Sequence, residues 1–337
     1  MHNIFEANQY PELPDEPVFS RGCFGKAEFQ NDFIHFGLKD KDMMEFKRQL
    51  RGLGALSAKA YQTDNERVYR HIPDTQFILM NPVEVTTCAG VISPRVDMSG
   101  RSFPLVIFNS ISNCRLKRQT AAVPVLLQEF FEQASELMLK DLKNMNLEGL
   151  ESAVAGFSGI SSDLTRSRLF DAVMDLLKGT DVREFWQRLP IEDDPAERAR
   201  FITTIMVLLN IVIKQSPGKI PWGIRLPLPD TEFVLPYVVL YIQLVESRLK
   251  ECSWQAQVFW NRANDQLAAS LTIFFRPVKS VMLHQLFDPQ HSKELIVDVL
   301  DEMKRYDKPT EQAFIITGND KDSLMDALFK WAGFESP

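Results

Sequence analysis

The stretch Gly90-Val-Ile-Ser-Pro-Arg-Val-Asp-Met-Ser-Gly-Arg-Ser-Phe-Pro-Leu-Val-Ile-Phe108 decides the fold of this chain. It begins with a short apolar run, breaks at Ser93-Pro94, and re-enters a bulky run at Phe103. Proline biases the residue before it away from helix, and the Asp, Ser and Gly between the runs favour turns. The β-branched and aromatic residues that follow are typical of buried strands. The stretch therefore predicts two strands, 86–92 and 104–111, joined by an ordered loop.

The predicted loop is longer than a minimal hairpin requires, and connections of about ten residues often carry function. Asp97 and Arg101 lie four residues apart near its tip, so a charge pair between them would clamp it. An exposed pair of this kind contributes only about 0–1 kcal/mol. Ordinary architecture is the favoured interpretation of the loop, and partner binding is the alternative.

Outward from this stretch, periodicity and capping signals predict a mixed set of elements. Further strands are predicted at 18–25, 76–80, 257–260, 268–275 and 312–317. Helices are predicted at 40–50, 55–61, 120–145, 164–178, after Asp181, after Asp194-Pro195, and at 233–248, 291–305 and 320–331. Residues 216–230 are rich in proline and glycine, which predicts a loop.

These elements indicate an α/β (mixed α+β) protein. Its N-terminal part is rich in strands with flanking helices, its middle is helical, and its C-terminal part holds a small set of strands and helices. Residues 1–17 contain three prolines and form an N-terminal extension. We expect an α/β domain at 18–145 and a C-terminal helical and α/β domain at 146–337. Residues 147–161, with three glycines, are the predicted linker.

Composition excludes several classes of protein. The chain has 337 residues and a net charge of -7, whereas a nucleic-acid binder needs a basic stripe. Its four cysteines include no CxxC pair, which indicates a reduced, cytoplasmic setting, and the N-terminus does not resemble a signal peptide. The apolar segments 201–213 and 233–245 are shorter than the roughly 18–20 residues of a membrane span. We expect a soluble protein with no membrane span.

Residues with catalytic or ligand chemistry form no recognisable constellation. The segment Gly22-Cys-Phe-Gly-Lys26 has two residues between its glycines, where a phosphate-binding loop needs four and a Ser or Thr after the lysine. The five histidines have no metal-ligand spacing. We therefore expect no catalytic residue, no metal, no cofactor and no small-molecule substrate, and the chemistry of the side chains favours a protein that is not an enzyme.

An aromatic and basic string near the C-terminal strands has two interpretations. Trp and Arg are enriched in binding hot spots, so the string could be a recognition surface. A core strand with buried aromatic side chains explains it equally well. The residues concerned are Trp254, Phe259, Trp260 and Arg262.

Two motifs together carry a resemblance to a known family. The first is a Gly-aromatic-Gly-Lys turn followed by an Asp-Phe step, and the second is a Pro-x-x-Asp turn followed by Gly-Arg and a Pro-Leu strand. Their residues are Gly22, Phe24, Gly25, Lys26, Asp32 and Phe33, then Pro94, Asp97, Gly100, Arg101 and Pro104. In order and spacing this resembles the TagF (ImpM) family of type VI secretion accessory proteins. Asn31, Phe46 and Arg95 depart from the usual family residues.

The resemblance implies a cytoplasmic, non-enzymatic repressor. Proteins of this family hold type VI secretion in check after translation by contacting the forkhead-associated scaffold protein of the system. The motif residues would then serve partner binding or architecture. Two alternatives stay open: a hydrolase or phosphatase in which Asp32, Asp97 and Arg101 converge on a pocket, and a structural subunit of the apparatus with a large exposed apolar patch.

Overall fold

A computed structural model describes residues 18–61, 66–81, 86–112, 119–158, 166–250, 252–288, 295–305 and 320–333. Within these residues nine strands form one sheet in the order β2-β1-β5-β4-β3-β7-β8-β6-β9. All neighbouring strands are antiparallel except β6 and β9, which are parallel. The strands are β1 (Val18–Gly25), β2 (Ile34–Phe36), β3 (Thr75–Asn81), β4 (Thr86–Ser93), β5 (Leu105–Ser112), β6 (Gly223–Pro227), β7 (Gln257–Asn261), β8 (Ser270–Phe274) and β9 (Ile296–Asp298).

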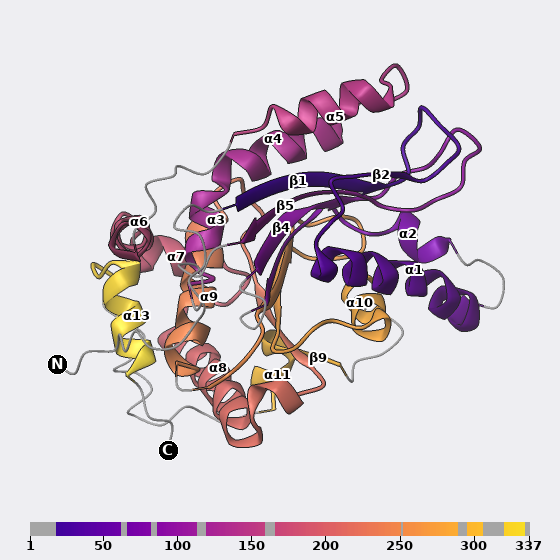
Figure 1. Cartoon of the computed structure of the whole chain (residues 1–337). Coiled ribbons are helices and arrows are strands. Elements are labelled where there is room, and N and C mark those ends of the chain that lie inside the picture. The colour runs from indigo at the N-terminus through magenta and orange to yellow at the C-terminus, as the bar shows by residue number, and fades with distance from the viewer. Residues whose placement is uncertain are drawn as a thin grey trace.

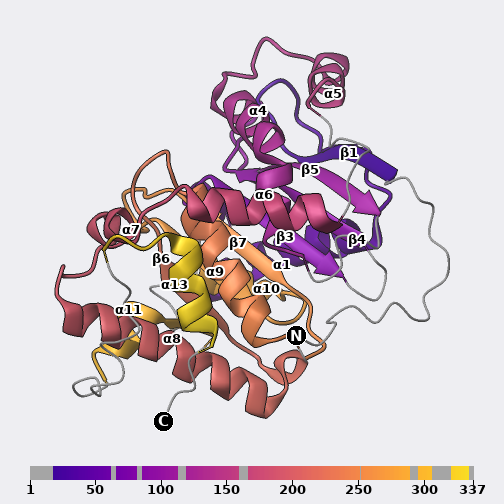
Figure 2. The same cartoon turned by 90° about the vertical axis from the view of Figure 1, so that its left-hand side faces the viewer.

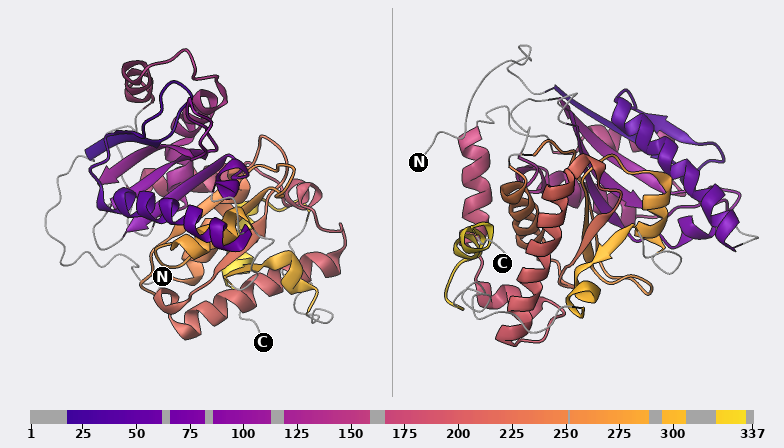
Figure 3. Two further views of the ribbon diagram at one scale, coloured as in Figure 1. Left: turned by 90° about the vertical axis from the view of Figure 1, so that its right-hand side faces the viewer. Right: turned by 90° about the horizontal axis from the view of Figure 1, so that it is seen from below.

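Helices cover both faces of the sheet (Figure 1). One face carries α1 (Lys41–Tyr61), α2 (Arg67–Arg70) and α10 (Ser280–Phe287), and α1 lies across the N-terminal strands in Figure 3. The other face carries the remaining helices, with α6, α9 and α13 in front of the sheet in Figure 2. These are α3 (Ala122–Leu126), α4 (Gln128–Leu139), α5 (Leu147–Ala155), α6 (Arg166–Lys178), α7 (Val182–Arg188), α8 (Pro195–Gln215), α9 (Leu235–Arg248), α11 (Val299–Met303) and α13 (Leu324–Ala332).

The alternation of side chains along the strands builds two apolar layers. In β5, Leu105 and Ile107 face the larger helical layer, whereas Val106 and Phe108 face α1 and α10. Because successive residues of a strand point to opposite faces, a run that is apolar at every position is buried on both sides. This explains why the run that ends at Phe108 is uniformly bulky.

The prediction from the opening stretch is confirmed. Strands β4 and β5 pair over their whole length, with Gly90 opposite Phe108 and Ser93 opposite Leu105. The mixed α+β class, the first strand and the two strands near 257–274 are confirmed as well. Asp194 caps α8 as expected, since its side chain accepts hydrogen bonds from the backbone N–H groups of Ala196 and Glu197.

Several predicted elements are wrong in extent or type. The two helices predicted at 40–50 and 55–61 are one helix, α1, and the long helix predicted at 120–145 is divided into α3 and α4. The predicted linker 147–161 contains α5, whose N-terminus is capped by Asn146. Of the helix predicted at 291–305, the described residues form strand β9 and then the short helix α11. The strand predicted at 312–317 lies outside the described residues.

The loop predicted at 216–230 contains an interior strand, β6, between β8 and β9. Its glycine and proline lie at the two ends of the strand, Gly223 and Pro227, where they do not interrupt its pairing. Gly223 also makes room for a neighbour, because a Cβ atom there would lie 2.6 Å from Cδ1 of Phe274. The proline and glycine content of residues 216–230 therefore predicts a loop, although the segment contains a core strand.

The sheet joins the N-terminal and C-terminal halves of the chain. Strand β3 pairs with β4 on one side and with β7 on the other, from Thr75 opposite Asn261 to Leu79 opposite Gln257. One run of backbone hydrogen bonds thus continues from the N-terminal strands into the C-terminal ones. The division into domains at 18–145 and 146–337 stays a prediction.

Candidate functional site

Two loops meet at one end of the N-terminal strands. The first leaves β1 after Gly25, and the second connects β4 to β5. They lie together because β1 pairs with β5, with Phe24 opposite Val106. Gly25 has φ +138°, and a Cβ atom there would lie 2.2 Å from the carbonyl oxygen of Pro104. Only glycine allows this close approach, which directs the next residue, Lys26, toward the second loop.

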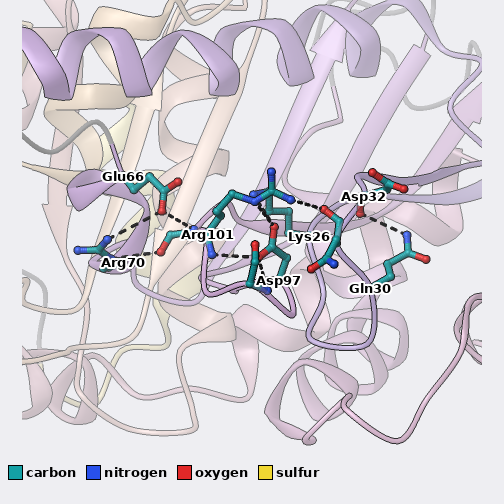
Figure 4. A network of polar contacts seen from close by, with 10 residues as sticks. Lys26, Gln30, Asp32, Glu66, Arg70, Asp97 and Arg101 are labelled. Carbon is teal, nitrogen blue, oxygen red and sulfur yellow. Dashed lines mark hydrogen bonds and ion pairs between the residues drawn. The ribbon is translucent and has the colours of Figure 1, made fainter.

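The carboxylate of Asp97 joins the two loops (Figure 4). Its Oδ2 accepts hydrogen bonds from Lys26 Nζ at 2.9 Å and from Arg101 Nε at 2.7 Å. Its Oδ1 accepts from the backbone N–H of Ser99 and of Arg101, both at 2.9 Å, and from the Ser99 hydroxyl at 2.7 Å. Arg101 also donates from Nη2 to the carbonyl of Asn31 at 2.7 Å, which ties the second loop to the first.

The two cations on this carboxylate have different environments. The side chains of Asp97 and Lys26 are 0% and 6% exposed, whereas that of Arg101 is 54% exposed. Burial by itself would raise the pKa of Asp97, but the hydrogen bonds from Lys26, Ser99 and Arg101 outweigh it and hold this pKa well below its usual range. Asp97 is therefore a buried anion that is fully satisfied by the protein itself.

Backbone hydrogen bonds fix the shape of the second loop. The N–H of Asp97 donates to the carbonyl of Arg101 at 3.0 Å, and the N–H of Gly100 donates to the carbonyl of Asp97 at 2.9 Å. Gly100 has φ +81°, the left-handed conformation that favours glycine. A bridge between Val96 and Ser102 closes the loop at its base.

Contacts from α2 hold one flank of the loop. The carboxylate of Glu66 accepts a hydrogen bond from the backbone N–H of Ser102 at 2.6 Å, and Arg70 Nε donates to the Ser102 hydroxyl at 3.2 Å. Next to them the ring of Phe103 lies 5.0 Å from the ring of Tyr69 and 5.0 Å from that of Phe33. The base of the loop is thus packed as well as hydrogen-bonded.

Arg95 holds the opposite flank. Its Nη1 pairs with the carboxylate of Glu28 at 2.9 Å, and its Nη2 donates to the carbonyl of Met138 at the end of α4. Both charged side chains are mostly buried. The departure from the usual family residue at this position therefore has an architectural role here, because it ties the loop to α4.

The tip of the loop is apolar and exposed. Met98 is 65% exposed and Val96 is 39% exposed, whereas Asp97 between them is buried. Phe33, from the first loop, is 36% exposed, and the guanidinium of Arg51 lies 4.9 Å from the centre of its ring. The site therefore presents apolar side chains on a framework that is held from three directions.

The structure brings together most of the motif residues. Gly25, Lys26, Pro104, Asp97 and Arg101 meet as described above. Gly22 and Phe24 lie in β1 under Phe108, and the ring of Phe24 lies 6.2 Å from that of Phe108. Pro94 and Gly100 belong to the second loop. The predicted Asp97–Arg101 pair is confirmed.

Asp32 does not join this cluster. Its carbonyl accepts a hydrogen bond from Gln30 Nε2 at 3.3 Å, and Figure 4 shows its carboxylate pointing away from Asp97 and Arg101. The convergence of Asp32, Asp97 and Arg101 that the hydrolase alternative requires is therefore absent, since only Asp97 and Arg101 are in contact.

The aromatic string near the C-terminus forms core structure. Phe259 and Trp260 lie in β7 and are 1% and 4% exposed, so a recognition surface built on them is wrong. Trp254 packs against the ring of Phe275 at 5.9 Å, and Arg262 is exposed where β7 ends. Both faces of a central strand are covered, and this is why both aromatic rings of β7 are buried.

Sequence reasoning missed the residues that support the loop. The contact between Lys26 and Asp97 joins positions 71 residues apart, and it depends on the order of strands in the sheet. Glu66 and Arg70 stand at helical i,i+4 spacing, a weak signal for an ion pair that does not indicate where the pair would lie.

The described residues contain no group of three or more His, Cys, Asp or Glu side chains arranged to hold a metal ion. In the same part of the chain, none of the helices combines the length and the apolar character that crossing a membrane requires.

Comparison with known proteins identifies the N-terminal part of the chain. Residues 22–156 match the family described as the TagF N-terminal domain, type VI secretion system-associated. This range contains both loops and ends after α5. None of the curated proteins matches the sequence.

A solved structure is similar to the fold at low sequence identity. It is the crystal structure of PA0076 from Pseudomonas aeruginosa PAO1, which is 17% identical. The alignment covers 81% of this chain and 96% of that chain, with a TM-score of 0.48.

Proposed function

We propose that this chain, whose residues 22–156 match the TagF N-terminal domain family of type VI secretion system-associated proteins, represses assembly of the secretion apparatus after translation. It does so in the cytoplasm, as a binding protein rather than an enzyme. Its partner is the forkhead-associated scaffold protein of the system. We call the loop between β4 and β5, which the contacts to Asp97 hold in place, the clamped loop. The family match supports a type VI secretion accessory protein, and the geometry of the clamped loop supports binding.

The single observation that carries the binding role is the exposed tip on a rigid loop. Met98 is 65% exposed, yet the residues on either side of it are held by the hydrogen bonds to Asp97. A loop that is already ordered loses less conformational entropy when a partner binds. Methionine, with its flexible thioether, adapts to the shape of an apolar partner surface. The loop is therefore suited to insert Met98 into a pocket on the partner.

The environment of Asp97 favours architecture over catalysis. A general acid or base needs a free position that can reach a substrate. Both oxygens of Asp97 accept hydrogen bonds from within the protein, and the side chain is 0% exposed. This supports the non-enzymatic proposal over the hydrolase alternative.

The apolar surface around the loop is small. Its exposed apolar side chains are Phe33, Val96 and Met98, and the half-exposed Arg101 lies in the same loop as Val96 and Met98. Permanent subunits use larger and more continuous apolar interfaces. The composition of this surface supports a partner that binds and leaves over a structural subunit.

A binding and secretion experiment tests the proposal. The purified chain is mixed with the immobilised forkhead-associated scaffold, and secretion is measured in a strain that lacks the gene. We expect retention of the chain on the scaffold and increased secretion in the deletion strain. Absence of binding together with unchanged secretion contradicts the proposal. Stoichiometric co-purification with the baseplate would instead indicate a structural subunit.

A further inference from the structure

A groove lies on the molecule away from the clamped loop, between β1 and α5. It has a volume of about 570 Å³ and is open to solvent on one side. It is lined by residues of β1, of the end of β2 and of α5, namely Phe19, Arg21, Phe36, Gly37, Glu151, Val154 and Ala155. Figure 1 shows α5 along the same side of the sheet as the exposed edge of β1. Nothing in the clamped loop uses these residues.

The floor of the groove is an unpaired sheet edge. Strand β2 covers β1 only from Cys23 to Gly25, and Gly37 lies directly against the carbonyl of Arg21. Among the described residues no strand pairs with the outer edge of Val18–Ser20, which is roughly 7 Å long at about 3.3 Å per residue. An edge with free N–H and C=O groups is a template for another strand.

The outward direction of the backbone groups follows from the neighbouring contacts. A Cβ atom on Gly37 would lie 2.0 Å from the carbonyl oxygen of Arg21, and one on Gly22 would lie 2.6 Å from that of Phe36. The carbonyls of Arg21 and Phe36 therefore point toward each other's strand. In an antiparallel strand the N–H and C=O of one residue point the same way and alternate along the chain. Phe19, two residues before Arg21, thus directs both groups to the open edge, whereas the carbonyl of Arg21 is covered by Gly37.

The side chain of Arg21 adds a charge to the groove. Its Nη1 donates to the carbonyl of Ala155 at 2.6 Å, which ties the end of α5 to β1. Its Nε is buried and has no hydrogen-bond partner among the described residues. A buried N–H without an acceptor is costly, and a carboxylate is the strongest acceptor for a guanidinium.

From these observations we infer that the groove binds an extended segment of a partner protein, which adds as a strand to β1 and places an Asp or Glu side chain against Arg21. The backbone N–H and C=O of Phe19 supply the pairing, and the apolar side chains of Phe36 and Val154 contact alternate side chains of the segment. Glu151 on the opposite wall disfavours a second acidic residue there.

The chain's own N-terminal segment suits this edge less well. It precedes β1 directly, but Pro11, Pro14 and Pro17 supply no N–H for pairing with a sheet edge. The inferred segment is also distinct from the proposed scaffold contact, because the groove uses the start of β1 and the clamped loop follows its end. The failure of one contact therefore leaves the other unaffected.

Selection of peptides tests the inference. A library of random twelve-residue peptides displayed on phage is panned against the full-length chain. We expect enriched peptides in which apolar residues alternate and one acidic residue recurs. A synthetic copy of the most enriched peptide should bind at least tenfold more weakly to Arg21→Met and to Phe19→Pro, which removes an N–H that faces the groove. Arg262→Met, a change at an exposed arginine at the end of β7, should bind it as the wild type does.

Hydrogen exchange supplies a second measurement that does not depend on the folding of a variant. Exchange at the amide of Phe19 should slow when the enriched peptide is added. The inference is overturned if no peptide is enriched over a blank surface, or if both β1 variants bind as tightly as the wild type. A Phe19 amide that is already protected without peptide would also overturn it, because the chain itself would then occupy the edge.

Discussion

At the scale of single residues, one carboxylate binds two cations that contribute differently. Lys26 is buried with Asp97, so each would lack a counter-charge in a dry environment if the other were lost. Arg101 is half exposed and can be solvated by water when its partner is missing. Asp97 Oδ2 therefore takes part in two ion pairs. The pair with Lys26 stabilises the fold, and the pair with Arg101 shapes the exposed loop.

Substitution of the two cations should separate these contributions. We expect Lys26→Met to lower the free energy of unfolding by about 3 kcal/mol, since it leaves a buried carboxylate with less compensation. Arg101→Ala should lower it by at most about 1 kcal/mol, because the guanidinium is half exposed and Lys26 stays on the carboxylate, while it loosens the loop and weakens partner binding. Urea denaturation monitored by tryptophan fluorescence measures both. Equal losses, or a larger loss for Arg101→Ala, would show that the arginine is the structural partner.

The depressed pKa of Asp97 also predicts a dependence on pH. A carboxylate with a lower pKa in the folded state stabilises the fold above its unfolded pKa of about 3.9, and this contribution is lost as the pH falls through the folded pKa. The stability difference between the wild type and Asp97→Asn should therefore shrink as the pH is lowered from 5.5 to 3.0. Asp230→Asn, at an exposed position, is the matched control. If the difference stays constant over this range, the contacts of Asp97 do not lower its pKa.

The residues of the site were only partly predictable. The pair between Asp97 and Arg101 follows from their spacing in a turn, which is local information. Lys26, Glu66 and Arg70 reach the same loop from two other segments, and their contacts depend on the order of strands and on where α2 lies. Short-range patterns in the sequence do not contain that information.

At the scale of single elements, glycine positions decide how closely β1 and its loop approach β5. Gly25 combines a positive φ with contact to the backbone of Pro104, and neither of these can relax by rotation of a side chain. Gly100 also has a positive φ, but a Cβ atom there would meet no atom within 4 Å. A Cβ atom added at Gly100 would therefore cause backbone strain alone, whereas one added at Gly25 would cause both backbone strain and a steric clash.

Alanine at these two positions should give different results. Gly100→Ala should lower the free energy of unfolding by about 1–2 kcal/mol through backbone strain alone. Gly25→Ala should cost more than that and displace the loop that carries Lys26. Thermal denaturation of the two variants, with binding assays on the folded fraction, checks the order. A Gly25→Ala protein as stable as Gly100→Ala would rule out the close approach to Pro104.

Elements were predictable where propensity and burial agree. The strands β4, β5, β7 and β8 have apolar, β-branched or aromatic residues at most positions and were placed correctly. Strand β6 was missed because its end residues are a glycine and a proline, and β9 was missed because its short segment runs directly into α11. In both cases tertiary pairing overrides the local signal.

At the scale of the whole molecule, the sheet connects the two halves of the chain. Strand β3 lies between β4 and β7 and is buried on both faces, so it belongs to both halves. The two apolar layers likewise combine residues from before and after position 146, such as Phe46 with Phe259. If one half of the chain were removed, the sheet edge and the apolar faces of the other half would be exposed to solvent.

The continuous sheet predicts cooperative unfolding. Scanning calorimetry of the full chain should show one transition, with a calorimetric enthalpy equal to the van't Hoff enthalpy. A fragment of residues 18–145 should aggregate or remain unfolded, because the edge of β3 and the face around Phe77 would lose their cover. Two separate transitions, together with a soluble folded fragment, would instead establish independent domains.

In the proposed function, the clamped loop presents Met98 to the forkhead-associated scaffold. Isothermal titration of the purified scaffold into the wild-type chain, Met98→Glu and Met44→Glu tests it most directly. Met44 is an exposed methionine of α1 that lies outside the loop, and it controls for the added charge. We predict tight binding for the wild type and Met44→Glu and a loss of at least tenfold in affinity for Met98→Glu. Equal affinities for all three proteins, or no heat of binding with the wild type, would contradict the account.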